Sequence, residues 1–84
     1  MKKKNQKYLD EFGKHLKTLI KAEETTPEAV AARGDIETKQ VYRVINAEHD
    51  PTLSTIVAIA KGLDIHTTTL FNFDLPIQPI EKKK

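Results

Sequence analysis

Residues that start or stop helices recur at short intervals along this chain of 84 residues, and they restrict it to short elements. Thr26-Pro27 is a strong helix start, because threonine caps free N–H groups and proline fits the first helical position. Gly34-Asp35 marks a tight turn, since glycine and, less readily, aspartate tolerate a left-handed backbone. Asp50-Pro51-Thr52 interrupts the chain again. Between these breaks there is room for short helices and for little else.

The apolar residues between the breaks recur at steps of three and four, the spacing of amphipathic helices. We predict helices at about residues 6–23, 27–33, 38–46, 53–62 and 67–71. The fourth is apolar over much of its girth, so we expect it to be central. The side chains expected to face inward include Leu9, Phe12, Leu16, Leu19, Ile20, Ile36, Val41, Val44, Ile45, Leu53, Ile56, Val57, Ile59, Leu70 and Phe71. The predicted fold class is therefore all-α, a compact bundle of five helices.

Beyond the last of these helices, apolar residues recur at every second position instead of every third or fourth. Phe73, Leu75 and Ile77 alternate with polar residues and proline, which predicts an extended segment. We therefore divide the chain into a basic flexible arm (1–5), a helical domain (6–72) and an extended C-terminal tail (73–84). This tail can supply a dimer contact or fold back on its own core, and the sequence leaves both open.

The composition argues against catalysis, metals and cofactors. The chain has no cysteine, which excludes disulfides and thiolate sites. The histidines His15, His49 and His66 lack metal-ligand spacing, and Ser54 lies too close in sequence to His49 and Asp50 for a triad. We expect no enzyme activity, no cofactor and no small-molecule ligand. No apolar run follows the N-terminal lysines or reaches membrane length, so we expect a cytoplasmic protein without a membrane partner.

Charge is unevenly distributed although the net charge is only +2. Residues 1–23 hold seven lysines against three acidic residues, whereas residues 24–50 hold six acidic residues against three basic ones. The ends of the chain are therefore basic and the middle is acidic, and this distribution counts against a nucleic-acid partner.

One polar stripe of the third helix is suited to DNA. Lys39, Tyr42, Arg43 and Asn46 are spaced i, i+3, i+4, i+7 and lie opposite the apolar positions of the same helix. Such a helix fits the major groove, where Arg43 can form a two-pronged hydrogen bond to guanine and Lys39 can reach guanine or a phosphate. The same stripe is also typical of an ordinary solvated helix face.

From Phe12 to Phe71 the chain resembles the Cro/C1-type (lambda-repressor-like, XRE-family) helix-turn-helix domain of five helices. The ordered set of segments that carries the resemblance is 12–19 (FGKHLKTL), 26–33 (TPEAVAAR), 36–44 (IETKQVYRV), 50–56 (DPTLSTI) and 70–71 (LF). Asp35 and Asp64 stand where the family often has glycine, and aspartate is an acceptable substitute there.

The resemblance implies a sequence-specific transcription regulator that binds double-stranded DNA, as a homodimer on a palindromic operator. By position, the base contacts are Thr38, Lys39, Tyr42 and Arg43. The implied backbone contacts are Thr26, Gln40 and Asn46, and the lysine arm adds Lys2, Lys3 and Lys4. The arm can lie along the DNA backbone or in a minor groove, or it can serve only as a solubilising tail.

Some residues depart from the family pattern and support an alternative. Pro27 replaces a glutamine that commonly holds a phosphate, and Ile45 replaces a common glutamate. With the acidic middle of the chain, these changes motivate the alternative of a protein-interaction module that keeps the fold but has weak or no DNA binding, for example an antitoxin-like partner. An exposed Ile45 would then be a contact point.

Overall fold

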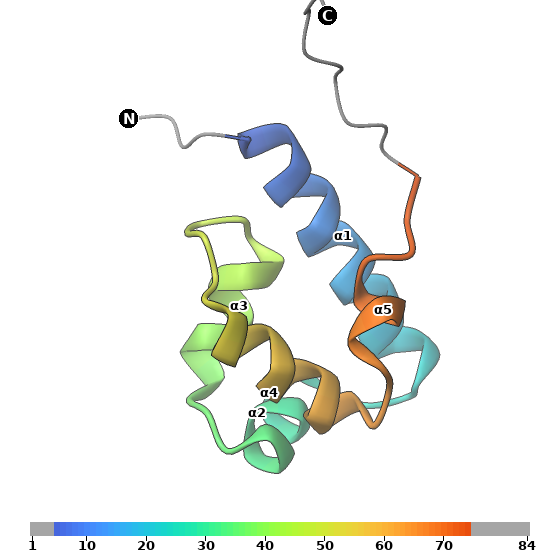
Figure 1. Ribbon diagram of the computed structural model, residues 1–84. Helices are drawn as coiled ribbons and strands as arrows, with labels where there is room; N and C mark the ends of the chain where they lie inside the picture. Colours follow the sequence, from blue (N-terminus) through green and yellow to red (C-terminus); the bar gives the residue numbers. More distant parts are fainter. Residues whose placement is uncertain (1–4, 75–84) are drawn as a thin grey trace, which may run out of the picture.

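Five short helices joined by tight turns make up the described part of the chain, residues 5–74, in a computed structural model (Figure 1). They are α1 (Gln6–Ala22), α2 (Pro27–Gly34), α3 (Thr38–Ile45), α4 (Leu53–Leu63) and α5 (Thr67–Leu70). Residues 5–74 contain no strand, so the all-α prediction is confirmed. In this range no helix is long and apolar enough to cross a membrane.

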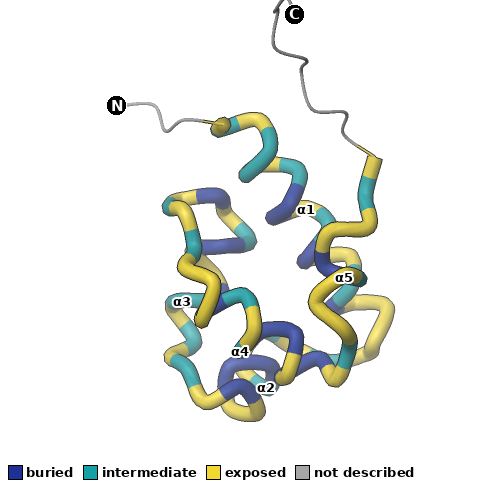
Figure 2. The backbone as a smooth tube through the Cα atoms, in the orientation of Figure 1, coloured by how far each residue is buried: buried dark blue, intermediate teal, exposed yellow. Residues whose placement is uncertain are grey.

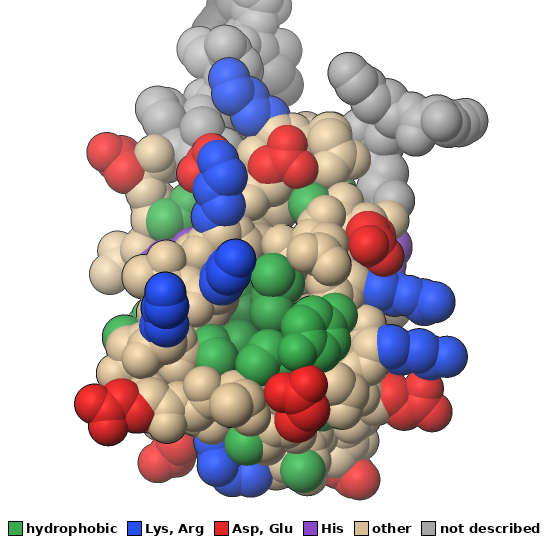
Figure 3. Space-filling model, turned by 180° about the vertical axis from the view of Figure 1, so that it is seen from behind, with side chains coloured by type: hydrophobic (Ala, Val, Ile, Leu, Met, Phe, Trp, Pro, Cys, Tyr) green, Lys and Arg blue, Asp and Glu red, His purple; other side chains and the backbone are tan. Residues whose placement is uncertain are grey.

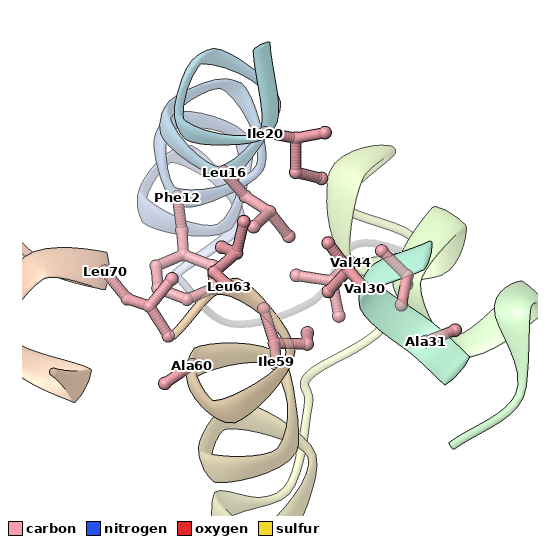
Figure 4. Close-up of a cluster of buried hydrophobic side chains, with 11 residues drawn as sticks. Phe12, Leu16, Ile20, Val30, Ala31, Val44, Ile59, Ala60, Leu63 and Leu70 are labelled. Carbon is pink, nitrogen blue, oxygen red and sulfur yellow. The ribbon is translucent and has the colours of Figure 1, made fainter. Parts of the chain in front are cut away.

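Side chains from all five helices meet in one core (Figure 4). The largest fully buried ones are Leu16, Val30, Val41, Val44, Ile59 and Leu70. Full burial of such a side chain stabilises the fold by about 1.5–3 kcal/mol. The buried positions line the inward sides of the helices, and exposed positions alternate with them along the outside (Figure 2). Because Val41 and Val44 hold α3 from within, the opposite side of that helix is free to face outward.

Glycine is placed at helix crossings, not at left-handed turns. A Cβ added to Gly34 would collide with the backbone carbonyl of Ala58 in α4, and one added to Gly62 would collide with that of Val30 in α2. Gly13 likewise lies against backbone carbonyls of α3. Of the Gly34-Asp35 pair expected to form the turn, Asp35 is the residue that adopts the left-handed backbone, at φ 60°, as Asp64 does at φ 57°. The three glycines therefore let the helix backbones approach closely.

Two expectations about burial are wrong. Helix α4 contributes Ile59, Ala60 and Leu63 to the core, but Leu53 is 75% exposed and Val57 is 47% exposed, so these two side chains do not face inward as expected. The helix packs on α2 and α5 with one side only, and Thr55 is buried on that side. Phe71 is 42% exposed, although its ring lies 5.0 Å from that of Phe12. Apolar side chains consequently remain on the surface along α4 and after α5.

The chain after α5 folds back on α1. The Phe73 ring lies 5.0 Å from that of Tyr8 and 5.3 Å from that of His15. His15 Nε2 also lies 2.8 Å from the carbonyl oxygen of Thr69, which ties α1 to α5. Residues 75–84, the larger part of the predicted extended tail, and residues 1–4 of the predicted arm lie outside the described residues.

Candidate nucleic-acid interface

Local signals place α2 and α3 as a helix-turn-helix pair. The Thr26 hydroxyl accepts a hydrogen bond from the Ala29 N–H at 3.1 Å and caps α2, with Pro27 at the first helical position. At the other end, left-handed Asp35 reverses the chain, and the Ile36 N–H donates to the Ala31 carbonyl at 3.0 Å. Ile36 packs against the core. Only residues 35–37 separate the two helices, so this short turn restricts how α3 can be oriented relative to α2.

The start of α3 is organised by its own side chains. The Glu37 N–H donates to Gln40 Oε1 at 3.2 Å, half of a reciprocal cap. Lys39 Nζ lies 3.7 Å from Glu37 Oε1, and both side chains are well exposed, so this ion pair contributes little to stability. The side-chain oxygen of Gln40 is thus occupied by the helix, and a backbone contact from Gln40 would have to use its amide NH₂ group.

Four of the predicted contact residues lie together on the exposed face of α3. Lys39, Tyr42, Arg43 and Asn46 are exposed, opposite the buried valines of the same helix. Thr38 is half-buried at the first position of α3. The stripe expected from the sequence therefore exists as one outward row of long polar side chains.

A hollow of about 360 Å³ lies beside this row, between the second half of α1, the start of α2 and α3. Figure 3 shows hydrophobic side chains gathered on this face, with Lys and Arg side chains on either side. The hollow brings together Thr26, Tyr42 and Asn46, three of the predicted contacts. Ile45 lines it as well but is half-buried and packed against the core, so it is not the freely exposed contact of the interaction-module hypothesis.

Sequence reasoning missed two cations at the rim of the hollow, Lys17 and Lys21 of α1. Their signal is visible in retrospect, because Lys14, Lys17 and Lys21 recur at steps of three and four along the polar side of that helix. These lysines place positive charge beside α3, although residues 24–50 are acidic. The arm residues Lys2, Lys3 and Lys4 lie outside the described residues.

One hydrogen bond spans the pair of helices. The Tyr42 hydroxyl, on α3, donates to Glu28 Oε2, in the first turn of α2, at 2.9 Å. This hydrogen bond, reinforced by the negative charge of Glu28, raises the pKa of Tyr42 above its ordinary value. A phenol is protonated at neutral pH even without this rise, so the Tyr42 hydroxyl is the donor.

In residues 5–74 no group of three or more His, Asp or Glu side chains is placed to hold a metal ion. What the site offers is a set of hydrogen-bond donors and cations on one convex helix, with an apolar hollow beside it. Such a surface suits the edges of bases and the phosphates of DNA.

Comparison with known proteins agrees with this geometry. A family model described as Helix-turn-helix matches residues 16–70, more than half of the chain. The crystal structure of the restriction-modification controller protein C.AhdI from Aeromonas hydrophila superposes with a TM-score of 0.71 at 28% sequence identity, covering 75% of this chain and 96% of that one. Among curated proteins no match was found.

The chain belongs to this helix-turn-helix family, of the Cro/C1 (XRE) type. It is a DNA-binding transcription regulator. The family comprises regulatory DNA-binding proteins and not enzymes.

Proposed function

We propose that the protein recognises a palindromic operator in double-stranded DNA as a homodimer, with α3 in the major groove. The observation that carries this proposal is the outward row of Lys39, Tyr42, Arg43 and Asn46 on a helix held from behind by buried valines. Arg43 is the principal base reader, since its guanidinium can bind O6 and N7 of one guanine together. Thr38 and Lys39 read neighbouring bases from the first turn of α3.

Contacts to the DNA backbone surround this row. Thr26 and Asn46 line the hollow beside α3, and Lys17 and Lys21 add two cations at its rim. Gln40 and the arm lysines Lys2, Lys3 and Lys4 complete the set of proposed backbone contacts. Each phosphate contact made by a cation should make the slope of log affinity against log salt more negative by about 0.9. Because the six acidic residues of 24–50 offset these cations, we propose weak binding to random DNA. This role also keeps the expected cytoplasmic location, where the DNA is accessible.

A second copy of the chain is proposed to cover the exposed apolar side chains of α4 and of the segment after α5. Leu53, Val57 and Phe71 are all more than two-fifths exposed. Phe71 and Ile56 of α4 line one small apolar hollow, so the two groups of side chains are neighbours. A dimer formed there is independent of residues 75–84, and the tail contact expected from the sequence stays a prediction. Two recognition helices about 34 Å apart would read successive major grooves.

The deciding experiment selects bound fragments from a random duplex pool at about 100 mM salt, where weak non-specific contacts are largely suppressed. We expect an enriched palindrome whose half-site spacing gives the distance between the two recognition helices. No enrichment with a folded protein would reject operator binding and favour the protein-interaction module.

The dimer surface has its own test, the molecular mass in solution of Leu53→Lys beside that of Ser54→Lys. Both positions are exposed on the first turn of α4, but only Leu53 is apolar. We expect Leu53→Lys to give a monomer and Ser54→Lys to remain a dimer. A dimer in both variants would place the interface elsewhere, and a monomeric wild-type chain would reject the dimer.

A further inference from the structure

The hydroxyl of Tyr42 is engaged within the protein, which changes what this residue can offer to DNA. A phenol has a single hydrogen to donate, and that hydrogen goes to Glu28 Oε2 at 2.9 Å. Phosphate oxygens and the purine N7 and O6 atoms are acceptors and require a donor. Its oxygen can still accept from a base amino group, but towards these acceptors Tyr42 presents only its aromatic ring, and the residue is 41% exposed.

The ring is part of an apolar surface. It lines the hollow together with Pro27 at the start of α2 and with Ile20 and Ile45, which pack in or against the core. An exposed apolar concavity within a polar face is unusual for a site that contacts only phosphates, and it indicates an apolar ligand group. DNA offers two such groups at its surface, the 5-methyl group of thymine and the C–H edge of deoxyribose.

We propose that the ring of Tyr42, with Pro27 and Ile45, receives an apolar C–H group of the operator, and that Glu28 is a positioning residue that holds the ring in place. The inference rests on the proposed operator binding and deepens it, because it assigns an apolar target to a residue expected to contact bases. Glu28 acts from α2 by fixing the direction of the Tyr42 side chain through the hydroxyl. The Tyr42–Glu28 pair therefore links α2 to the DNA-contacting face of α3.

The test measures equilibrium binding of the selected operator to the wild-type chain and to Tyr42→Phe, Tyr42→Ala and Glu28→Gln. Tyr42→Phe keeps the ring and loses only its positioning, so it should bind about twofold more weakly than wild type, whereas Tyr42→Ala should bind about tenfold more weakly, as expected for losing a packed ring. A loss in Tyr42→Phe equal to that in Tyr42→Ala would show that the hydroxyl makes the contact, and would overturn the proposal. Because Tyr42 is on the surface, these variants should keep the wild-type melting temperature.

Replacing single thymines of the operator with uracil distinguishes a thymine methyl group from deoxyribose as the contact of Tyr42, because it removes only the 5-methyl group. If Tyr42 contacts a methyl group, one replacement weakens wild-type binding about fourfold, the effect of exposing one methyl-sized group, and leaves Tyr42→Ala unaffected. If Tyr42 contacts deoxyribose, uracil has no effect at any position while Tyr42→Ala still loses affinity.

The positioning role of Glu28 is tested by ultraviolet titration of Tyr42 in a Tyr8→Phe background, which leaves one tyrosine to observe. Glu28→Gln should lower the pKa of Tyr42 towards its ordinary value and should weaken operator binding less than Tyr42→Ala does. An unchanged pKa would reject the hydrogen bond and with it the positioning role.

Arg43→Ala separates this inference from the proposed function. If Arg43→Ala weakens operator binding and Tyr42→Ala does not, the inference on Tyr42 fails and operator binding stands. If the wild-type chain selects no operator at all, the proposed function itself fails.

Discussion

Helices α2 and α3 are both eight residues long and adjacent in the chain, yet they differ in how much of their surface is buried and in what they expose. Helix α2 packs against both α4 and α3. Its small buried residues, Ala31 and Gly34, let the backbones of these helices come close to its own. Helix α3 is buried on one side only, by two valines, and carries long polar side chains on the other. The comparison teaches that changes at the positions of α2 that pack on α3 and α4 should act on stability, whereas changes on the outer face of α3 should act on DNA affinity.

The largest expected effect is a loss of stability when the close contact between α2 and α4 is disturbed. Gly34→Val should lower the free energy of unfolding by about 3 kcal/mol, because the new side chain meets the backbone carbonyl of Ala58, which cannot move aside cheaply. Urea unfolding measures this loss. Ala32→Val, on the exposed side of the same helix, is the matched control and should cost less than about 1 kcal/mol. Equal losses would mean that the crossing of α2 and α4 is not the constraint.

Two arginines, one in each helix, sharpen the comparison. Arg43→Ala on α3 should weaken operator binding by about 2 kcal/mol and leave stability unchanged. Arg33→Ala on α2 should do the reverse, since Arg33 Nε donates to the Gly62 carbonyl and its Nη2 to the Thr25 hydroxyl, both at 2.9 Å. Operator titrations and thermal unfolding of both variants give the four values. If both variants lost the same DNA affinity, the division of roles between the two helices would be wrong.

The cap of α2 should have a smaller effect. Thr26→Ala removes the acceptor for the Ala29 N–H and should cost about 1 kcal/mol of stability. Thr18→Ala is the control, because the Thr18 hydroxyl only donates back to the Lys14 carbonyl within α1 and gives little stability. Chemical unfolding of the pair measures the difference. Similar values for the two would show that α2 is held by packing alone.

The smallest expected effect is a change of stability from a residue in the turn between α1 and α2. Glu24 is exposed and has φ 53°, a left-handed conformation that is strained for a residue with a Cβ. Glu24→Gly should therefore raise the free energy of unfolding by about 0.5 kcal/mol. Glu24→Ala removes the same carboxylate but keeps the strain, so it should not stabilise, and a gain in Glu24→Ala equal to that in Glu24→Gly would point to charge as the cause.

Local signals were enough to predict the five helices to within a residue or two. A capping threonine, a proline at the first helical position and apolar spacing of three and four act over one or two turns, and all of them are written in contiguous sequence. The outward row on α3 was predictable for the same reason, because Lys39, Tyr42, Arg43 and Asn46 belong to a single helix. Similarity of ordered segments added the class of protein.

Contacts between helices were decided only by the tertiary structure. Apolar spacing shows that Leu53, Val57 and Phe71 can be buried, but whether a partner surface covers them depends on how the helices cross. The same holds for the glycines, whose close neighbours come from other helices. The bond from Tyr42 to Glu28 and the lysines of α1 beside α3 join residues from separate helices. Periodicity is a property of one helix, whereas a hollow or a crossing is a property of two or three, and only their packing decides which side chains meet there.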